Sequence, residues 1–275
     1  MDLIPNFWAY QAAFGLHVAA VALFIAYAAS PKRALSLAAT VCLSAAAVLL
    51  GAFLLRLGIA EGGLPLSSGF GALGFWSLCL TVLVLGAEWR YQLGLLGAFL
   101  APLSALTLLM GFRFAKVDAQ PTQGMAGVWL AAHVSLAMFS YACFTVAAGV
   151  AAAFLVQERQ LKRKLLGSLT YQLPALADLE SLAGLFGAIG AQALGSALLF
   201  GFMWKHSLNE GLGLGDPTVI FGILVWMAYT GIWQLRAQGA LRGRRFAYLL
   251  LLFFLLIFFG YYLLNIYVGG HGARP

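Results

Sequence analysis

Two of the four histidines in this 275-residue chain lie where they could share one metal ion. His133 heads a long apolar run, and His271 closely follows the last apolar run, in the closing sequence Val-Gly-Gly-His-Gly-Ala-Arg-Pro. With the topology predicted below, both imidazoles lie at the outer face of a membrane. A neutral imidazole pair can hold haem iron at both axial positions without a covalent bond to the porphyrin. The pair therefore predicts a haem b site with His133 and His271 as the iron ligands.

Taken alone, each histidine has an ordinary explanation. His133 could be a hydrogen-bonded packing residue, and His271 a solvated residue of a terminal tail. His206, in a predicted outer loop, is either a solvated residue or an alternative ligand. His17 lies deep in the first apolar run, where it either donates a hydrogen bond between helices or binds a second haem. It is the shared membrane face of His133 and His271 that favours a paired role.

An aromatic and glycine-rich loop separates the sixth apolar run from the seventh. Trp204 precedes this loop, Asp216 ends it, and Trp226 lies in the run that follows. Aromatic residues at such boundaries commonly anchor a helix at the membrane interface. Trp204 and Trp226 could equally form an apolar shelf for a flat porphyrin, with Asp216 shaping the loop beside it. All three are therefore candidate residues of the haem pocket.

The composition indicates a protein that crosses a membrane many times. The chain is 63% hydrophobic and only 9% charged, with a mean hydropathy of +0.92, whereas a soluble domain is roughly 25% charged. The charges fall between apolar runs of about 20 residues, the length of a transmembrane helix. We predict an all-α, polytopic membrane protein that forms one domain over residues 1–275. Its bundle of about eight transmembrane helices should span 7–29, 35–56, 69–88, 92–112, 127–156, 183–204, 218–236 and 246–267.

The basic residues predict the orientation of these spans. Of the 16 Lys and Arg residues, 11 lie in one set of loops, at positions 32, 33, 90, 159, 162, 163, 164, 236, 242, 244 and 245. The other five lie in the alternate loops, at positions 56, 113, 116, 205 and 274. Cytoplasmic loops carry the excess of Lys and Arg. Both termini are therefore predicted to lie on the outer side, together with His133, His206 and His271.

Three further segments carry structural predictions. The basic segment 157–164 should extend the fifth helix to the level of the lipid headgroups, where it could dock an anionic lipid or a protein. The acidic residues after Pro174 should start a short interfacial helix. In the sixth span, small residues that allow close helix packing recur at every fourth position, at Gly187, Ala191 and Gly195.

The residue inventory excludes several classes of protein. The three cysteines lie in apolar runs, and the chain has no Cys-x-x-Cys or Cys-x-x-Cys-His motif, so it lacks the thiols for disulfide exchange and covalent haem attachment. A proton-driven carrier would need an intramembrane Asp, Glu or Lys, but every acid of this chain maps to a loop or a span end. The net charge of +7 fits cytoplasmic loop anchors better than a nucleic-acid partner.

The chain resembles the cytochrome c assembly membrane proteins that handle haem, the family of CcsA and CcmC with the related HemX and YpjD-type proteins. The resemblance is strongest over 128–271, and the first four spans match only in general character. Six pieces carry it by their order and spacing, at residues 133–141, 157–164, 173–180, 226–229, 242–245 and 269–271. The resemblance implies that His133 and His271 are paired outer haem ligands, which flank a Trp-rich loop that contains an aspartate.

This loop departs from the family pattern. The tryptophans expected just before Asp216 are replaced by Gly-Leu-Gly, and the Lys-Glu expected after the proline reads Thr218-Val219. The family's histidine in the seventh span falls at Gln234, which is not an ordinary haem ligand. The departures argue against an inner haem site and against a full haem-lyase activity, and they favour the HemX branch of the family.

The leading hypothesis is a multi-pass protein of a bacterial inner membrane that binds haem b reversibly and non-covalently at its outer face. It would support cytochrome c maturation or haem homeostasis and would not itself be an enzyme. Its partners would be haem, membrane lipid and other maturation proteins or a haem-synthesis enzyme. An alternative is a haem-independent regulator or scaffold of tetrapyrrole synthesis, which would act through the cytoplasmic basic loops. A small-solute transporter is a third alternative, against which the lack of buried acids counts.

Overall fold

The computed structural model describes residues 7–66, 68–91, 94–112, 124–164, 173–209 and 215–267, without the side chains of 91, 94–95 and 261–267. Within these ranges the chain forms eight helices and no strand, which confirms the all-α prediction. They are α1 (Phe7–Ala29), α2 (Arg33–Glu61), α3 (Gly69–Tyr91), α4 (Gly94–Gly111), α5 (Gly124–Lys162), α7 (Leu176–Ser207), α8 (Pro217–Ala237) and α9 (Gly243–Tyr267).

Seven of these helices are long and apolar enough to cross a bilayer, as a polytopic membrane protein requires. The eighth, α4, is a shorter apolar helix with Pro102 inside it. Helices are suited to this environment because every interior backbone N–H and C=O is satisfied within its own segment. The apolar runs of the sequence therefore became helices in the predicted order.

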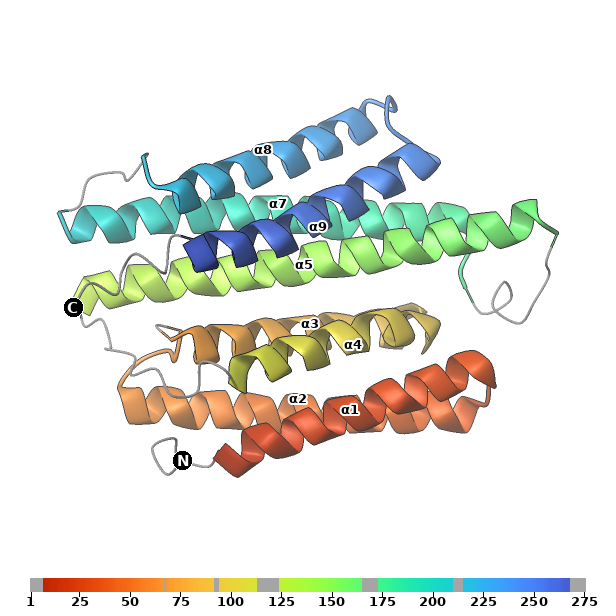
Figure 1. Cartoon of the computed structure of the whole chain (residues 1–275), viewed down its shortest axis with the longest axis horizontal. Coiled ribbons are helices and arrows are strands. Elements are labelled where there is room, and N and C mark those ends of the chain that lie inside the picture. The colour runs from red at the N-terminus through yellow and green to blue at the C-terminus, as the bar shows by residue number, and fades with distance from the viewer. Residues whose placement is uncertain are drawn as a thin grey trace.

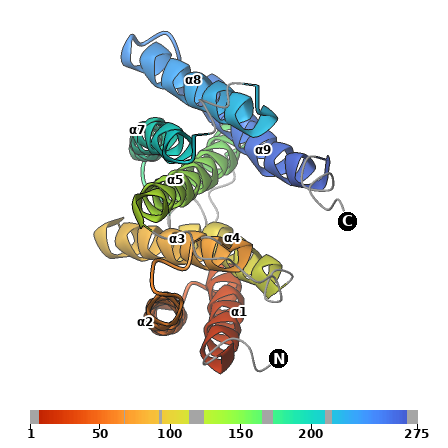
Figure 2. The same ribbon diagram turned by 90° about the vertical axis from the view of Figure 1, so that its left-hand side faces the viewer.

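The helices pack as four layers of two (Figure 2). The α1–α2 pair lies against the α3–α4 pair, α5 and α7 follow, and α8 and α9 form the last layer. The helix α5 lies near the middle of the bundle, where it contacts α3, α4, α7 and α9. A single hydrophobic cluster runs through this centre, from Phe24 of α1 to Ile257 of α9. The central position of α5 matters because this helix carries His133.

Neighbouring helices along the chain run in alternating directions (Figure 1). As a result, α5 begins and α7 ends at one end of the bundle, where α8 also begins and α9 ends. We call this the histidine end, because His133 lies in the third turn of α5. We call the opposite end, where α5 ends and α9 begins, the basic end.

The basic end brings together the described members of the larger set of Lys and Arg residues. Lys32 precedes α2 and Arg33 begins it, Arg90 lies in the last turn of α3, and Arg236 in that of α8. The loop partition that the orientation prediction used therefore holds in three dimensions. That the basic end faces the cytoplasm stays a prediction.

Two helices are longer than their apolar runs. The helix α5 continues to Lys162, which confirms the extension predicted for the basic segment. The helix α7 begins at Leu176, and Asp178 lies in its first turn. The prediction of a separate interfacial helix after Pro174 is therefore wrong. The continuous helix has a physical reason, because Leu179 and Leu182 are buried in the central cluster.

Candidate functional site

His133 is held by a backbone carbonyl of the neighbouring helix. Its Nδ1 donates a hydrogen bond to the Ala197 carbonyl of α7 over 2.7 Å. A carbonyl oxygen can only accept, so in the neutral ring the proton sits on Nδ1 and Nε2 keeps its lone pair. Within the described part of the chain, Nε2 has no hydrogen-bond partner. The contact therefore selects the tautomer and orientation that an Nε2 ligand needs.

A glycine makes room for this ring. A Cβ atom on Gly201, one turn after Ala197 on α7, would lie 2.8 Å from Nδ1 of His133. Such a contact is too short for real atoms, so any side chain at position 201 would force the imidazole to move. Ala197 and Gly201 together form the seat on which the ring of His133 lies.

The same two helices are joined a second time, deeper in the bundle. The Ser140 hydroxyl donates to the Gly190 carbonyl over 2.8 Å. Ser140 follows His133 by seven residues, and Gly190 precedes Ala197 by seven, as two antiparallel helices require when their register is kept over two turns. These two bonds hold α5 and α7 in register, so the position of His133 is set by the whole helix pair.

Aromatic and apolar side chains line the region around His133. Met138 of α5 and Ala197 of α7 form a small buried cluster, against which Trp76 of α3 packs. One turn from His133 towards the histidine end, the Trp129 ring stacks on Phe200 of α7 at 5.8 Å between ring centroids. These lining residues were not predicted from the sequence, because aromatic residues are frequent in every span.

Two buried indole groups near this region have no hydrogen-bond acceptor. Nε1 of Trp204 and Nε1 of Trp76 are both buried and unpaired within the described residues. Trp204 follows Ala197 by seven residues, so it lies on the same face of α7, about 10 Å further towards the histidine end. A buried donor without an acceptor is costly, and a ligand oxygen that accepts from it would remove that cost.

Asp216 connects α7 to α8 at the histidine end. Its Oδ1 accepts from the Thr218 backbone N–H at 2.9 Å, which caps α8 ahead of Pro217. Its Oδ2 accepts from Nζ of Lys205, also at 2.9 Å. The Lys205 ammonium, with the Thr218 amide, holds the pKa of Asp216 below its usual range. Both carboxylate oxygens are engaged, so Asp216 shapes the connection between the helices.

Trp226 lies on the other side of α7 from His133. Its indole packs against Gly195, where an added Cβ would lie 2.6 Å from Nε1. Gly195 and Trp204 are nine residues apart, which on a helix places them on opposite faces. The structure therefore does not bring Trp204 and Trp226 onto one shelf. The prediction that the small residues of α7 serve close packing is confirmed at Gly195, against which Trp226 packs, whereas a Cβ at Gly187 would make only an ordinary contact with Leu250 of α9.

The other three predicted histidines differ in their surroundings. His206 lies exposed in the last turn of α7, at the histidine end. His271 lies outside the described residues. His17 has no exposed surface, and both of its ring nitrogens are engaged, Nδ1 with the Ala13 carbonyl at 2.8 Å and Nε2 with the Thr81 hydroxyl at 2.9 Å. In this arrangement His17 joins α1 to α3.

Comparisons with known proteins give the site a context. A family model described as cytochrome C assembly protein matches residues 66–271. Protein HemX of Brevibacillus brevis is 26% identical over 227 residues, which cover 81% of this chain and 82% of that protein. Cytochrome c biogenesis protein CcsA of Guillardia theta is 24% identical over 224 residues, 74% of either chain.

Protein HemX of Bacillus subtilis is 26% identical over 136 residues, which cover 50% of this chain and 49% of that protein. No solved structure matches the chain at a significant level. The resemblance inferred from the sequence, including its HemX-like character, is therefore confirmed. The family match includes His133 and the whole of α5 to α9, whereas α1, α2 and His17 lie outside it.

Proposed function

Because this chain belongs to the cytochrome c assembly protein family, we propose that it holds haem b non-covalently and thereby supports cytochrome c maturation or haem homeostasis. The proposed site lies at the outer face of a bacterial inner membrane. His133 and His271 are its axial ligands. Haem supplies an iron with two axial positions, and a pair of neutral imidazoles can fill them without any covalent bond to the porphyrin.

The observation that supports this proposal most directly is the hydrogen bond from Nδ1 of His133 to the Ala197 carbonyl. Metal-binding histidines commonly donate their second ring N–H to a carbonyl or carboxylate, which orients the ring and makes it a better donor to the metal. His133 already has this partner, and its Nε2 has none among the described residues. A histidine used only for packing would more often be satisfied at both nitrogens, as His17 is.

The surroundings of His133 also suit a flat, mainly apolar ligand with acidic groups at one edge. Trp204 and Trp76 offer unpaired indole N–H groups that could each donate to a carboxylate oxygen. Asp216 and Lys205 keep the connection between α7 and α8 in place, and Trp226 supports α7 from its far side.

The position of His271 in the sequence supports its choice as the second ligand. The helix α9 ends at Tyr267 at the histidine end, four residues before His271 (Figure 1). Four extended residues span at most about 14 Å. In this proposal His271 approaches the iron from the C-terminal segment, and His206 serves as the alternative ligand from α7.

An absorption spectrum of the detergent-purified protein, with and without added haem, tests the proposal. The wild type should show the Soret and alpha bands of bis-histidine haem, and H133A and H271A should each lose them. H17A is the control and should keep the bands, because both ring nitrogens of His17 are already engaged. Loss of the bands in H206A but not in H271A would identify His206 as the second ligand. Bands that survive in the H133A/H271A double variant would refute the assignment.

The alternative function, a haem-independent regulator of tetrapyrrole synthesis, makes the opposite prediction for that spectrum. The wild-type protein would then show no haem bands. Instead, it would retain a soluble partner from membrane extracts, and neutralising Lys162, Arg163 and Lys164 would release that partner. The concentration of basic side chains at one end of the bundle supports this candidate, whereas the orientation of His133 favours the first.

A further inference from the structure

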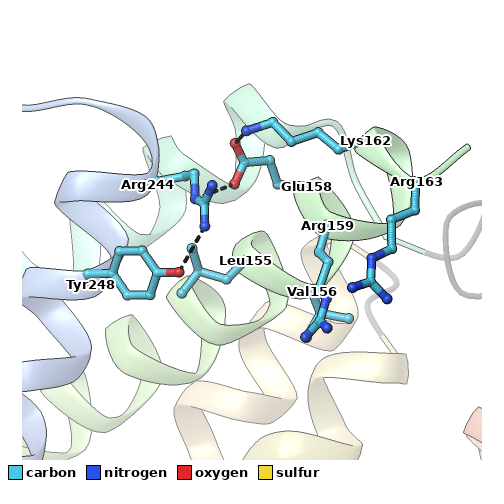
Figure 3. Close-up of a pocket in the computed structure, with 8 residues that line it drawn as sticks. All are labelled: Leu155, Val156, Glu158, Arg159, Lys162, Arg163, Arg244 and Tyr248. Atoms are coloured by element: carbon cyan, nitrogen blue, oxygen red, sulfur yellow. Dashed lines mark hydrogen bonds and ion pairs between the residues drawn. The ribbon is translucent and has the colours of Figure 1, made fainter.

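A pocket lies at the basic end, between the end of α5 and the beginning of α9 (Figure 3). Its volume is about 450 Å³, within the usual range of small-ligand sites. Eight residues line it: Leu155, Val156, Glu158, Arg159, Lys162, Arg163, Arg244 and Tyr248. Five of them belong to the last turns of α5, two to the first turns of α9, and Arg163 directly follows α5. The pocket combines cations with an apolar wall.

The charge of this pocket is strongly positive. Four cationic side chains line it, and Glu158 is its only carboxylate, so the formal charge of the lining is 4 − 1 = +3. Both oxygens of Glu158 are taken. Oε1 accepts from Lys162 at 2.6 Å, and Oε2 pairs with Nε of Arg244 at 3.2 Å. Glu158 is mainly buried, at 15% exposure, and so it holds one cation from each helix at the pocket wall.

Two further cations of this pocket have no counter-charge. Arg159 is exposed in the last turn of α5 and Arg163 is exposed directly after its end. Neither guanidinium group has a partner within the part of the chain that the structure describes. In Figure 3 both guanidinium groups lie apart from the Glu158 pairs. A guanidinium group binds phosphate oxygens through paired N–H donors. This part of the pocket therefore has unused capacity for an anion.

The remaining wall of the pocket is apolar and faces outwards. Val156 is partly exposed, and the Tyr248 ring is half exposed. Along α9, the exposed apolar surface continues from Tyr248 through Leu252 to Leu255. The candidate membrane span of α9 begins at Gly243, directly before Arg244. The cations thus lie where the span starts, at the level of lipid headgroups, and the apolar strip leads away from them along the span.

We propose that this pocket binds the headgroup of an anionic phospholipid, with its phosphate against Arg159 and Arg163 and its acyl chains along the exposed strip of α9. Charge complementarity selects an anion, and the adjoining apolar surface selects a lipid over a soluble acidic protein. The site is distinct from the proposed haem site, at the opposite end of the bundle, and does not depend on it. It would hold α5 and α9 at a defined height in the membrane.

Native mass spectrometry of the full-length protein tests this proposal. The protein is released from mixed micelles that contain equal amounts of phosphatidylglycerol and phosphatidylcholine. The wild type should retain one phosphatidylglycerol in preference to phosphatidylcholine, and R159Q/R163Q should bind it about 30-fold more weakly, from about 1 kcal/mol for each arginine removed. Both substituted side chains are exposed and unpaired, so the variant should fold normally, as circular dichroism and gel filtration can check.

The matched control is K32Q/R33Q, which removes two exposed charges at the same end of the bundle but outside the pocket. It should retain phosphatidylglycerol as the wild type does. Equal loss of lipid from both variants would show general electrostatic attraction and overturn the proposal. Complete displacement of the lipid by inorganic phosphate would identify a free-phosphate site, and complete displacement by a polyglutamate peptide would identify a protein dock. Either result would also overturn it.

Discussion

His17 and His133 differ in the hydrogen-bond partner of one ring nitrogen, Nε2. In both rings Nδ1 points at a backbone carbonyl, of Ala13 within α1 in one case and of Ala197 across to α7 in the other. Nε2 of His17 meets the Thr81 hydroxyl, whereas Nε2 of His133 meets no partner among the described residues. The same residue type can thus join two helices or be prepared as a ligand, and the partner of the second nitrogen decides which.

The wider surroundings of the two histidines differ in the same way, satisfied around His17 and unsatisfied around His133. His17 belongs to a buried polar chain through α1, α3 and α4. Its Nδ1–H donates to the Ala13 carbonyl, so Nε2 accepts from the Thr81 hydroxyl, whose oxygen also lies 2.7 Å from the Ser77 carbonyl. The Ser77 hydroxyl in turn donates to the Ser104 carbonyl. Every side chain of that chain is satisfied within it, as a structural network requires. Around His133, by contrast, the indole groups of Trp76 and Trp204 are left without acceptors. Both unpaired indole groups lie within the residues that the family match covers, whereas His17 lies outside it.

The largest effect should come from exchanging His133 for alanine, and the same exchange at His17 is the comparison. H133A should abolish the haem bands of the purified protein, because it removes a proposed iron ligand. H17A should leave the bands unchanged, because its nitrogens are already occupied. Haem titration followed by absorption measures both. Loss of the bands in H17A but not in H133A would show that His17, and not His133, is needed to hold the haem.

The second effect should come from the seat of the His133 ring. In G201A the new Cβ would lie 2.8 Å from Nδ1, so the ring must move away from the Ala197 carbonyl. Loss of such an orienting contact commonly weakens metal binding about 10- to 100-fold, and haem titration should show a decrease of that size. G86A in α3, where a Cβ meets nothing within 4 Å, is the matched control and should bind haem as the wild type does.

A moderate effect on stability, without an effect on haem binding, is expected at His17. H17A removes a buried side chain and its two hydrogen bonds, and should lower the free energy of unfolding by roughly 1–3 kcal/mol. T81V keeps the side-chain size and removes only the hydroxyl, so it should cost about 0.6 kcal/mol. Thermal unfolding in detergent measures both variants. A T81V protein that is less stable than H17A would contradict the role given to the ring.

The smallest effect is expected at the ion pair of the histidine end. D216N keeps the helix cap and loses the charge that pairs with Lys205, and the partly exposed pair contributes roughly 0.2–1 kcal/mol. The pKa of Asp216 is lowered from its ordinary 3.8, so this contribution is present above pH 3.8 and is lost as the pH falls through the lowered value. Melting curves of wild type and D216N should differ slightly at neutral pH and converge in acid.

The sequence alone determined the membrane class, the number and order of the helices and the grouping of basic residues at one end. These properties are local, because an apolar run of about 20 residues must satisfy its backbone as a helix wherever its neighbours lie. The family resemblance also followed from local pieces in a fixed order. The ends of α5 and α7 were less well predicted, because turns beyond the apolar run are stabilised by packing that a hydropathy pattern does not contain.

Only the tertiary structure decided which nitrogen of each histidine is occupied. Ala197 and Gly201 carry no chemical signal in the sequence, and their role follows from the register of α5 on α7, which also pairs Ser140 with Gly190. Register depends on the shapes of two whole helix faces, so no single residue reveals it. For the same reason Trp204 and Trp226, which look equivalent along the chain, lie on opposite sides of α7.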